Sequence, residues 1–273
     1  MTLSVRQLML SFVLLSAAAV VHAQTNIRVD FEVNFDETGT GFAPLAGVFH
    51  DGSYSAFTPG EDASLGLESL AEIGNPSEFL SEVPSGFDFG NTDGQIGGTN
   101  RPLSRAFIVP VSDGNGNFSF AAMFLPSNDW FVSNPGGGSL DISALLNAPA
   151  GTQIVIDLDT IYDAGTESED FTRGGGTGAD PFDLVPRLSD ADGGNPDDQD
   201  DPVSIVTRTP GVNLFEDFEN PNSEPIARFL GASSAASLGT ITLTVVPEPS
   251  SLMMGFAGLL VSVVGRRRRS RAC

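Results

Sequence analysis

Hydrophobic and polar residues alternate near the start of the chain, between residues 27 and 35. Ile27, Val29, Phe31 and Val33 are each separated by one polar residue. This period of two predicts a β-strand with one face on a core and the other in water. A short apolar segment follows at residues 45–49, and later apolar runs bounded by Gly, Pro, Asn or Asp predict further strands at residues 105–111, 117–125, 153–158, 203–207 and 240–246.

One segment follows a different period. Leu67, Leu70 and Ala71 have helical spacing, and Gly74 followed by Pro76 is typical of a helix end. The rest of the pattern, many short strands with turn residues between them, favours the all-β class. The predicted fold is an antiparallel β-sandwich with one or two short helices.

The first 23 residues have the pattern of a signal peptide. Arg6 precedes an apolar run at residues 8–21, and the small residue Ala23 follows it. This order predicts cleavage between Ala23 and Gln24 and export of the body of the chain.

The other end of the chain has three parts in a fixed order. Pro247, Glu248 and Pro249 come first, and an apolar run of 13 residues follows at 252–264. A cluster of cations closes the segment: Arg266, Arg267, Arg268 and Arg269. The run is shorter than the roughly 20 residues that cross a bilayer comfortably, and the arginines favour the cytoplasmic side. The pattern predicts transient membrane insertion with the body facing outward.

This order resembles the PEP-CTERM sorting tail of Gram-negative bacteria. The resemblance implies that residues 247–273 are a sorting segment with a short transmembrane helix. It also implies that an exosortase-type processing enzyme is a partner and cuts near Pro-Glu-Pro. An ordinary tail anchor is the alternative, and it would leave the body on the membrane.

Charge and composition narrow the chemistry of the body. Both ends, residues 1–23 and 250–273, contain no acidic residue, and they hold six of the 13 basic ones. The body therefore carries 35 acids against seven arginines, a net charge of −28. A surface this acidic repels phosphate backbones, so we expect no nucleic-acid partner. Residues 189–201 form an acidic, polar stretch that is interpreted as an exposed loop.

Catalytic residue types are scarce. The one cysteine, Cys273, lies in the sorting segment, the chain has no lysine, and His50 is the one histidine outside the signal peptide. A Ser-His-Asp triad would have to use His50, and no nucleophile elbow marks its surroundings. We therefore expect no enzyme activity.

Three stretches of the body, taken together, resemble the spondin domain, the N-terminal module of F-spondin and mindin. They are PGEDAS at 59–64 leading into LAEIGN at 70–75, AAMFLPSNDWF at 121–131, and YDAGTE at 162–167. The resemblance implies a C2-like sandwich over residues 24–246 with a calcium site on loops at one end.

Matched residue by residue, the resemblance gives Asp129, Asp163 and Glu167 as calcium ligands. Calcium takes six to eight oxygen ligands in flexible geometry, so a few carboxylates and backbone carbonyls suffice. This chain has Tyr162 where the family has tryptophan, and Glu167 where animal members have aspartate. In the alternative interpretation, Asp129 and Asp163 only cap loops by accepting backbone hydrogen bonds.

These observations predict a secreted calcium-binding adhesion or ligand-binding module of the cell surface or of a biofilm matrix. Its expected binding partner is an extracellular polysaccharide or a surface protein. Before processing, the chain would be anchored in the membrane. Two alternatives stay open: a calcium-dependent carbohydrate hydrolase that uses paired carboxylates, and a structural matrix protein that self-associates through calcium.

Overall fold

The fold is that of a computed structural model, which describes residues 24–34, 41–97, 101–125, 129–166, 202–205 and 237–247. Strands dominate these ranges, and antiparallel pairing forms two sheets. The predicted all-β sandwich class is confirmed. The described residues contain three short helices rather than one or two.

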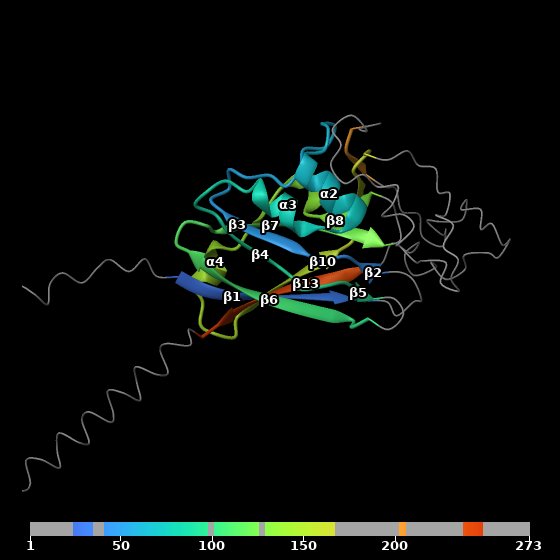
Figure 1. The fold of residues 1–273 in the computed structure, drawn as a ribbon. Helices are drawn as coiled ribbons and strands as arrows, with labels where there is room; N and C mark the ends of the chain where they lie inside the picture. The colour runs from blue at the N-terminus through green and yellow to red at the C-terminus, as the bar shows by residue number, and fades with distance from the viewer. Residues whose placement is uncertain are drawn as a thin grey trace, which may run out of the picture.

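The first sheet has four strands in the order β10-β13-β1-β6 (Figure 1). They are β1 (Gln24–Val33), β6 (Ser104–Ser112), β10 (Gln153–Leu158) and β13 (Gly239–Val246). Phe31 lies opposite Ile241 in this sheet, and both side chains are fully buried. Asp30 and Thr242, the next pair along, lie on the outer face. The alternation in the sequence thus becomes one core face and one outer face.

The second sheet is longer and follows the order β12-β11-β8-β7-β2-β5, with β3, β4 and β9 attached beside this path. Its strands are β2 (Gly41–Phe42), β3 (Ala46–His50), β4 (Asp88–Asn91), β5 (Ile96–Gly97), β7 (Asn117–Leu125), β8 (Trp130–Ser133), β9 (Leu140–Asp141), β11 (Ile161–Asp163) and β12 (Ser204–Ile205). Strand β7 is central and almost entirely buried, because one face meets the first sheet and the other meets the helices.

Two of the helices, α2 (Leu65–Ile73) and α3 (Pro76–Ser81), lie on the outer side of the second sheet (Figure 1). Leu67 and Leu70 of α2 pack in one apolar cluster with Phe131. Gly74 ends α2 with a φ of 67°, the left-handed conformation typical of a helix C-cap. A third helix, α4 (Ser143–Leu146), and a 3-10 turn, η1 (Pro135–Gly137), connect strands.

Two glycines shape the contact between the sheets. Gly47 and Gly90 lie opposite each other on β3 and β4, and the ring of Phe107 from β6 fills the space above them. A Cβ on Gly90 would come within 2.8 Å of that ring, and one on Gly47 within 3.1 Å. Phe107 of the first sheet therefore packs directly against the backbone of β3 and β4 in the second sheet, at two positions that lack a side chain.

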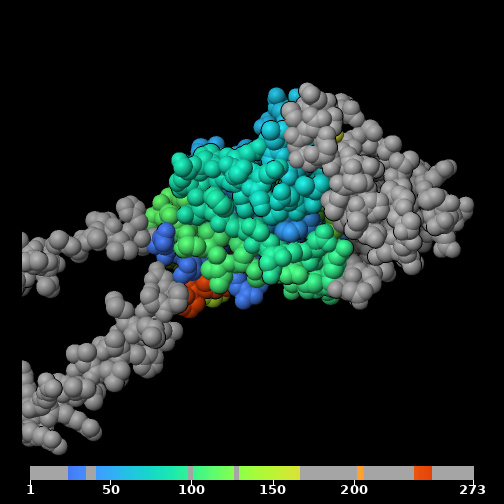
Figure 2. Space-filling view, in the orientation of Figure 1, coloured from blue at the N-terminus to red at the C-terminus, as the bar shows by residue number. Residues whose placement is uncertain are grey.

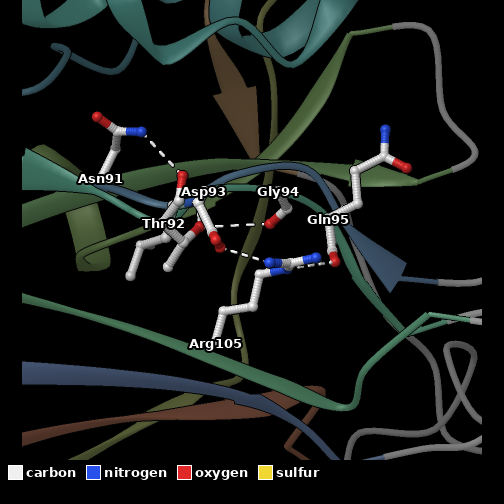
Figure 3. A network of polar contacts seen from close by, with 7 residues as sticks. Asn91, Thr92, Asp93, Gly94, Gln95 and Arg105 are labelled. Atoms are coloured by element: carbon white, nitrogen blue, oxygen red, sulfur yellow. Dashed lines mark hydrogen bonds and ion pairs between the residues drawn. The ribbon is translucent and has the colours of Figure 1, made fainter.

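A polar network joins the sheets at the loop between β4 and β5 (Figure 3). Arg105 of β6 donates to the Gln95 carbonyl at 3.0 Å and forms an ion pair with Asp93. Thr92 accepts a hydrogen bond from the Leu45 amide at 2.9 Å. The guanidinium of one sheet thus holds a loop that belongs to the other.

Candidate functional site

Two of the three predicted calcium ligands lie next to each other at the end of a strand pair. Asp129 directly precedes β8, and Asp163 is the last residue of β11. The antiparallel register places Asp163 opposite Trp130, and the Ala164 amide donates to the Asp129 carbonyl at 3.2 Å. Strand pairing thus brings together residues that are 34 positions apart in the sequence.

Both carboxylates hold the turn that follows β11. Asp163 Oδ1 accepts a hydrogen bond from the Gly165 amide at 2.8 Å, and Asp129 Oδ2 accepts one from the Thr166 amide at 3.1 Å. Gly165 has a φ of 69°, so the turn uses the left-handed region that suits glycine. Because the two amides are consecutive, the two carboxylates lie around the same short segment.

The carboxylates leave the ladder on opposite faces. Asp163 shares its face with Trp130, which belongs to the core between the sheets, whereas Asp129 shares its face with Ala164, beneath the helices. Asp129 is fully buried. These contacts match the capping role that the alternative interpretation expects.

Glu167, the third predicted ligand, lies outside the described residues. Within the ranges that the structure describes, no group of three or more His, Cys, Asp or Glu side chains is placed to hold a metal ion. The described part of the predicted site is therefore a pair of carboxylates at one turn.

Glu68 and Glu72 are two further buried acids, which the sequence reasoning did not single out. They lie one turn apart on α2, and each is only 3% exposed. Burial of a carboxylate is costly unless it is compensated, so these positions are unusual for a short helix. Their spacing of four residues was the available signal in the sequence.

His50 is a second residue whose surroundings only the structure reveals. Its Nδ1 accepts a hydrogen bond from the Gly52 amide at 3.0 Å, and its Nε2 lies 3.0 Å from Ser119 Oγ. An accepting Nδ1 places the proton on Nε2, which then donates to Ser119. This direction is opposite to that of a base that activates serine. The Asp51 carboxylate bonds to Ser53 rather than to the imidazole.

Burial of the imidazole lowers the pKa of His50, and the nearby Asp51 carboxylate opposes this shift. The ring packs edge-on against Tyr54, whose own pKa is raised by burial. His50 therefore belongs to an apolar, aromatic environment that favours its neutral form.

The two predicted processing junctions lie at one end of the sandwich. Gln24 begins β1, Pro247 directly follows β13, and the register pairs Asn26 with Val246. The blue start and the red end of the described chain accordingly meet at the same end of the molecule (Figure 2). The remaining predicted processing and topology residues lie outside the described ranges: Ala23, Glu248, Pro249, Arg266, Arg267, Arg268 and Arg269.

Asp129 and Asp163 lie at the other end. Strand β1 runs from Gln24 at the terminal end to Val33 at the far end, and β6 returns antiparallel to it. The next strands continue this alternation, so that the start of β8 and the end of β11 fall at the far end. The candidate site is therefore separated from both junctions by the length of the strands.

No helix in the described ranges is both long and apolar enough to span a bilayer. The predicted membrane segment, residues 252–264, lies outside those ranges.

The described part of the chain is thus an antiparallel β-sandwich with Asp129 and Asp163 at one end and the two predicted processing junctions, Gln24 and Pro247, at the other. The family model of the spondin N-terminal domain, Spondin_N, matches residues 21–183, more than half of the chain. The chain therefore belongs to the spondin N-terminal domain family. The PEP-CTERM protein-sorting motif matches residues 245–269. Comparison with curated proteins finds no match.

The two matches confirm both resemblances that the sequence analysis rests on. The sorting motif implies export, processing by exosortase, and a place at the cell surface or outside the cell after processing. The family match ends at residue 183, whereas β13 completes the first sheet at Val246. The domain limits of 24–246 stay a prediction.

Proposed function

We propose that the protein is a secreted, calcium-dependent binding module that attaches an extracellular polysaccharide or surface protein to the cell surface or its polymer matrix. Asp129 and Asp163 would hold the ion together with Glu167, at a position beyond the ends of β8 and β11, since their side chains start on opposite faces of that strand pair. One observation supports this proposal: the Asp163 and Asp129 carboxylates accept hydrogen bonds from two consecutive backbone amides, those of Gly165 and Thr166, and so lie at the same turn. Hard oxygen ligands on loops suit calcium better than zinc or copper.

The arrangement of the molecule also supports the proposal. Both predicted processing junctions lie at one end of the sandwich, and the turn that Asp129 and Asp163 hold lies at the other. A ligand bound beside that turn would be held away from the membrane. Calcium would also tie together the ends of β8 and β11, and ligand binding to the folded state raises stability by mass action.

A conservative substitution separates calcium ligation from turn capping. In Asp163→Asn the amide oxygen can still accept the Gly165 N–H, whereas the negative charge is lost. We expect calcium to raise the thermal unfolding midpoint of the parent protein and to raise that of Asp163→Asn much less. Asp113→Asn is the matched control, because Asp113 is an exposed acid on the turn that connects β6 of the first sheet to β7 of the second.

Isothermal titration calorimetry with calcium on the same proteins gives a direct measurement. A single site that Asp163→Asn abolishes and Asp113→Asn retains supports the proposal. Identical unfolding curves of the parent in calcium and in chelator would refute the calcium proposal. Asp129 and Asp163 would then serve only to cap the turn. Product formation from a polysaccharide panel would identify the hydrolase instead, and calcium-dependent growth in molecular mass would identify the self-associating matrix protein.

A further inference from the structure

Strand β10 lies at the outer edge of the first sheet, and β13 is its one neighbour among the described strands. Ile154 and Ile156 pack against the core between the sheets, yet both are only partly buried. The residues opposite them on β13, Leu243 and Ile241, are fully buried. The core is therefore incompletely covered along this edge.

The backbone of β10 presents its hydrogen-bonding groups to this edge at every second residue. The Val245 amide donates to the Thr152 carbonyl at 3.0 Å, so Thr152 and alternate residues after it direct their backbone groups toward β13. Gln153, Val155 and Asp157 consequently direct their N–H and C=O groups outward. Such a row on an edge strand is a template for another strand.

We propose that β10 pairs with β10 of a second copy of this chain, antiparallel, about a two-fold axis at Val155. In this register Val155 lies opposite the partner's Val155, and Gln153 lies opposite the partner's Asp157. Ile154 lies opposite the partner's Ile156 on the inner face, so each copy covers the open edge of the other core. The two first sheets then form one continuous sheet.

The sequence of β10 fits a second copy because it is self-complementary in this register. An amide lies opposite a carboxylate at both ends, two valines meet at the centre, and no like charges lie opposite each other. An axis one residue further along, at Ile156, would place Val155 against the partner's Asp157 instead. Val155 is 60% exposed, and burial of its side chain on association is favourable.

Net charge opposes the association of two copies. The body carries a charge of −28, whereas β10 contributes only Asp157 to the interface. Screening by salt weakens the long-range repulsion, so we expect the dimer to strengthen as ionic strength rises. The pairing does not use calcium, which separates this inference from the proposed metal site.

Disulfide trapping tests the register in the full chain. In a Cys273→Ser background, Val155→Cys places two thiols opposite each other, at a Cα separation of about 5.5 Å, which a disulfide can bridge. Ile108→Cys is the matched control, because Ile108 is 58% exposed on the outer face of β6, away from the axis. We expect the disulfide-linked dimer to form at least about tenfold faster with Val155→Cys, as pairing raises the effective thiol concentration.

Light scattering provides the second measurement, the molecular mass of the full chain. All samples contain a chelator and the same detergent. The parent should show a dimer, and Val155→Lys should shift it to monomer, because two ammonium groups would face each other. The thermal unfolding midpoint of that variant at low concentration should not change, since the side chain is exposed. A parent that is monomeric at every concentration, a dimer that survives Val155→Lys, or equal cross-linking of the two cysteine variants would overturn the proposal. If another segment of the same chain pairs with β10, the parent will be monomeric at every concentration.

Discussion

His50 lies in a buried chain of polar groups that depends on its protonation state. Nδ1 must be unprotonated to accept from the Gly52 amide, and the Ser119 hydroxyl donates in turn to the Gly138 carbonyl at 3.4 Å. If Nδ1 were also protonated, its N–H would face the Gly52 N–H, and two hydrogen-bond donors would meet with no acceptor between them. The pKa of His50 is lowered because burial penalises the charged ring.

The lowered pKa gives stability a defined dependence on pH. Since the unfolded chain binds a proton near the ordinary pKa of about 6.5, the contribution of His50 is complete above that pH. It is lost as pH falls through the lower pKa of the folded state. We expect the free energy of unfolding to decrease between pH 7.5 and pH 5.5.

Chemical denaturation of the parent and of His50→Gln at both pH values measures this contribution. At pH 7.5 the variant should be less stable by about 1–3 kcal/mol, the usual cost of disrupting a buried hydrogen bond. The gap should narrow at the lower pH. A constant gap would show that the pKa of His50 is the same in the folded and the unfolded chain, and a gap that widens on acidification would show that folding raises that pKa.

At the scale of elements, the two helices are joined by one carboxylate. Glu82, the C-cap residue of α3, accepts hydrogen bonds from the Gly66 amide at 2.7 Å and from Ser64 Oγ at 2.5 Å. Ser64 in turn accepts from the Leu67 amide. The start of α2 is thus capped from another helix, and a negative charge at a helix N-terminus is favourable. A Cβ on Gly66 would come within 2.7 Å of this carboxylate.

Removal of this cap should destabilise the helical layer. We expect Glu82→Ala to lower the free energy of unfolding by about 1 kcal/mol, as other losses of a helix cap do. Glu82→Gln, which keeps an acceptor oxygen, should cost less. Glu61→Ala is the control, since it removes an equal charge from an exposed position in the preceding turn. Equal losses for Glu61→Ala and Glu82→Ala in urea denaturation would assign the effect to net charge alone.

At the scale of the whole molecule, both junctions leave the domain where β1 begins and β13 ends. Pro247 follows the last residue of β13 directly, so cleavage at or after the Pro-Glu-Pro motif leaves the first sheet intact. Proline has no N–H and cannot extend the ladder, and it therefore gives the strand a defined end. The fold of the body should be unaffected by processing.

This separation predicts the outcome of a substitution in the motif. In a host that carries exosortase, we expect Glu248→Ala to accumulate as the uncleaved chain in the membrane fraction. The parent should be recovered as a shorter chain, and Ser250→Ala should behave like the parent. Intact-mass spectrometry measures each product. The same mature mass for Glu248→Ala and the parent would show that the motif does not direct cleavage.

Local patterns predicted much of the fold. The alternation from Ile27 to Val33 corresponds to β1, and the predicted strands at 117–125 and 153–158 correspond to β7 and β10. Helical spacing at Leu67 and Leu70 identified α2. These elements can be predicted from the sequence because burial of one face makes hydrophobic residues recur with a regular period. Strands such as β2 and β5 are two residues long, too short to carry a period.

The sequence alone determined the export and sorting signals, the all-β class and the family, since each is written in contiguous residues. Only the tertiary structure decided which distant residues meet. Strand pairing brought Asp129 to the turn after Asp163, burial set His50 against Ser119, and sheet order left β10 at an edge. Contacts of this kind depend on register and on layer packing, and a period along the chain records which face a residue occupies, without recording what lies opposite it.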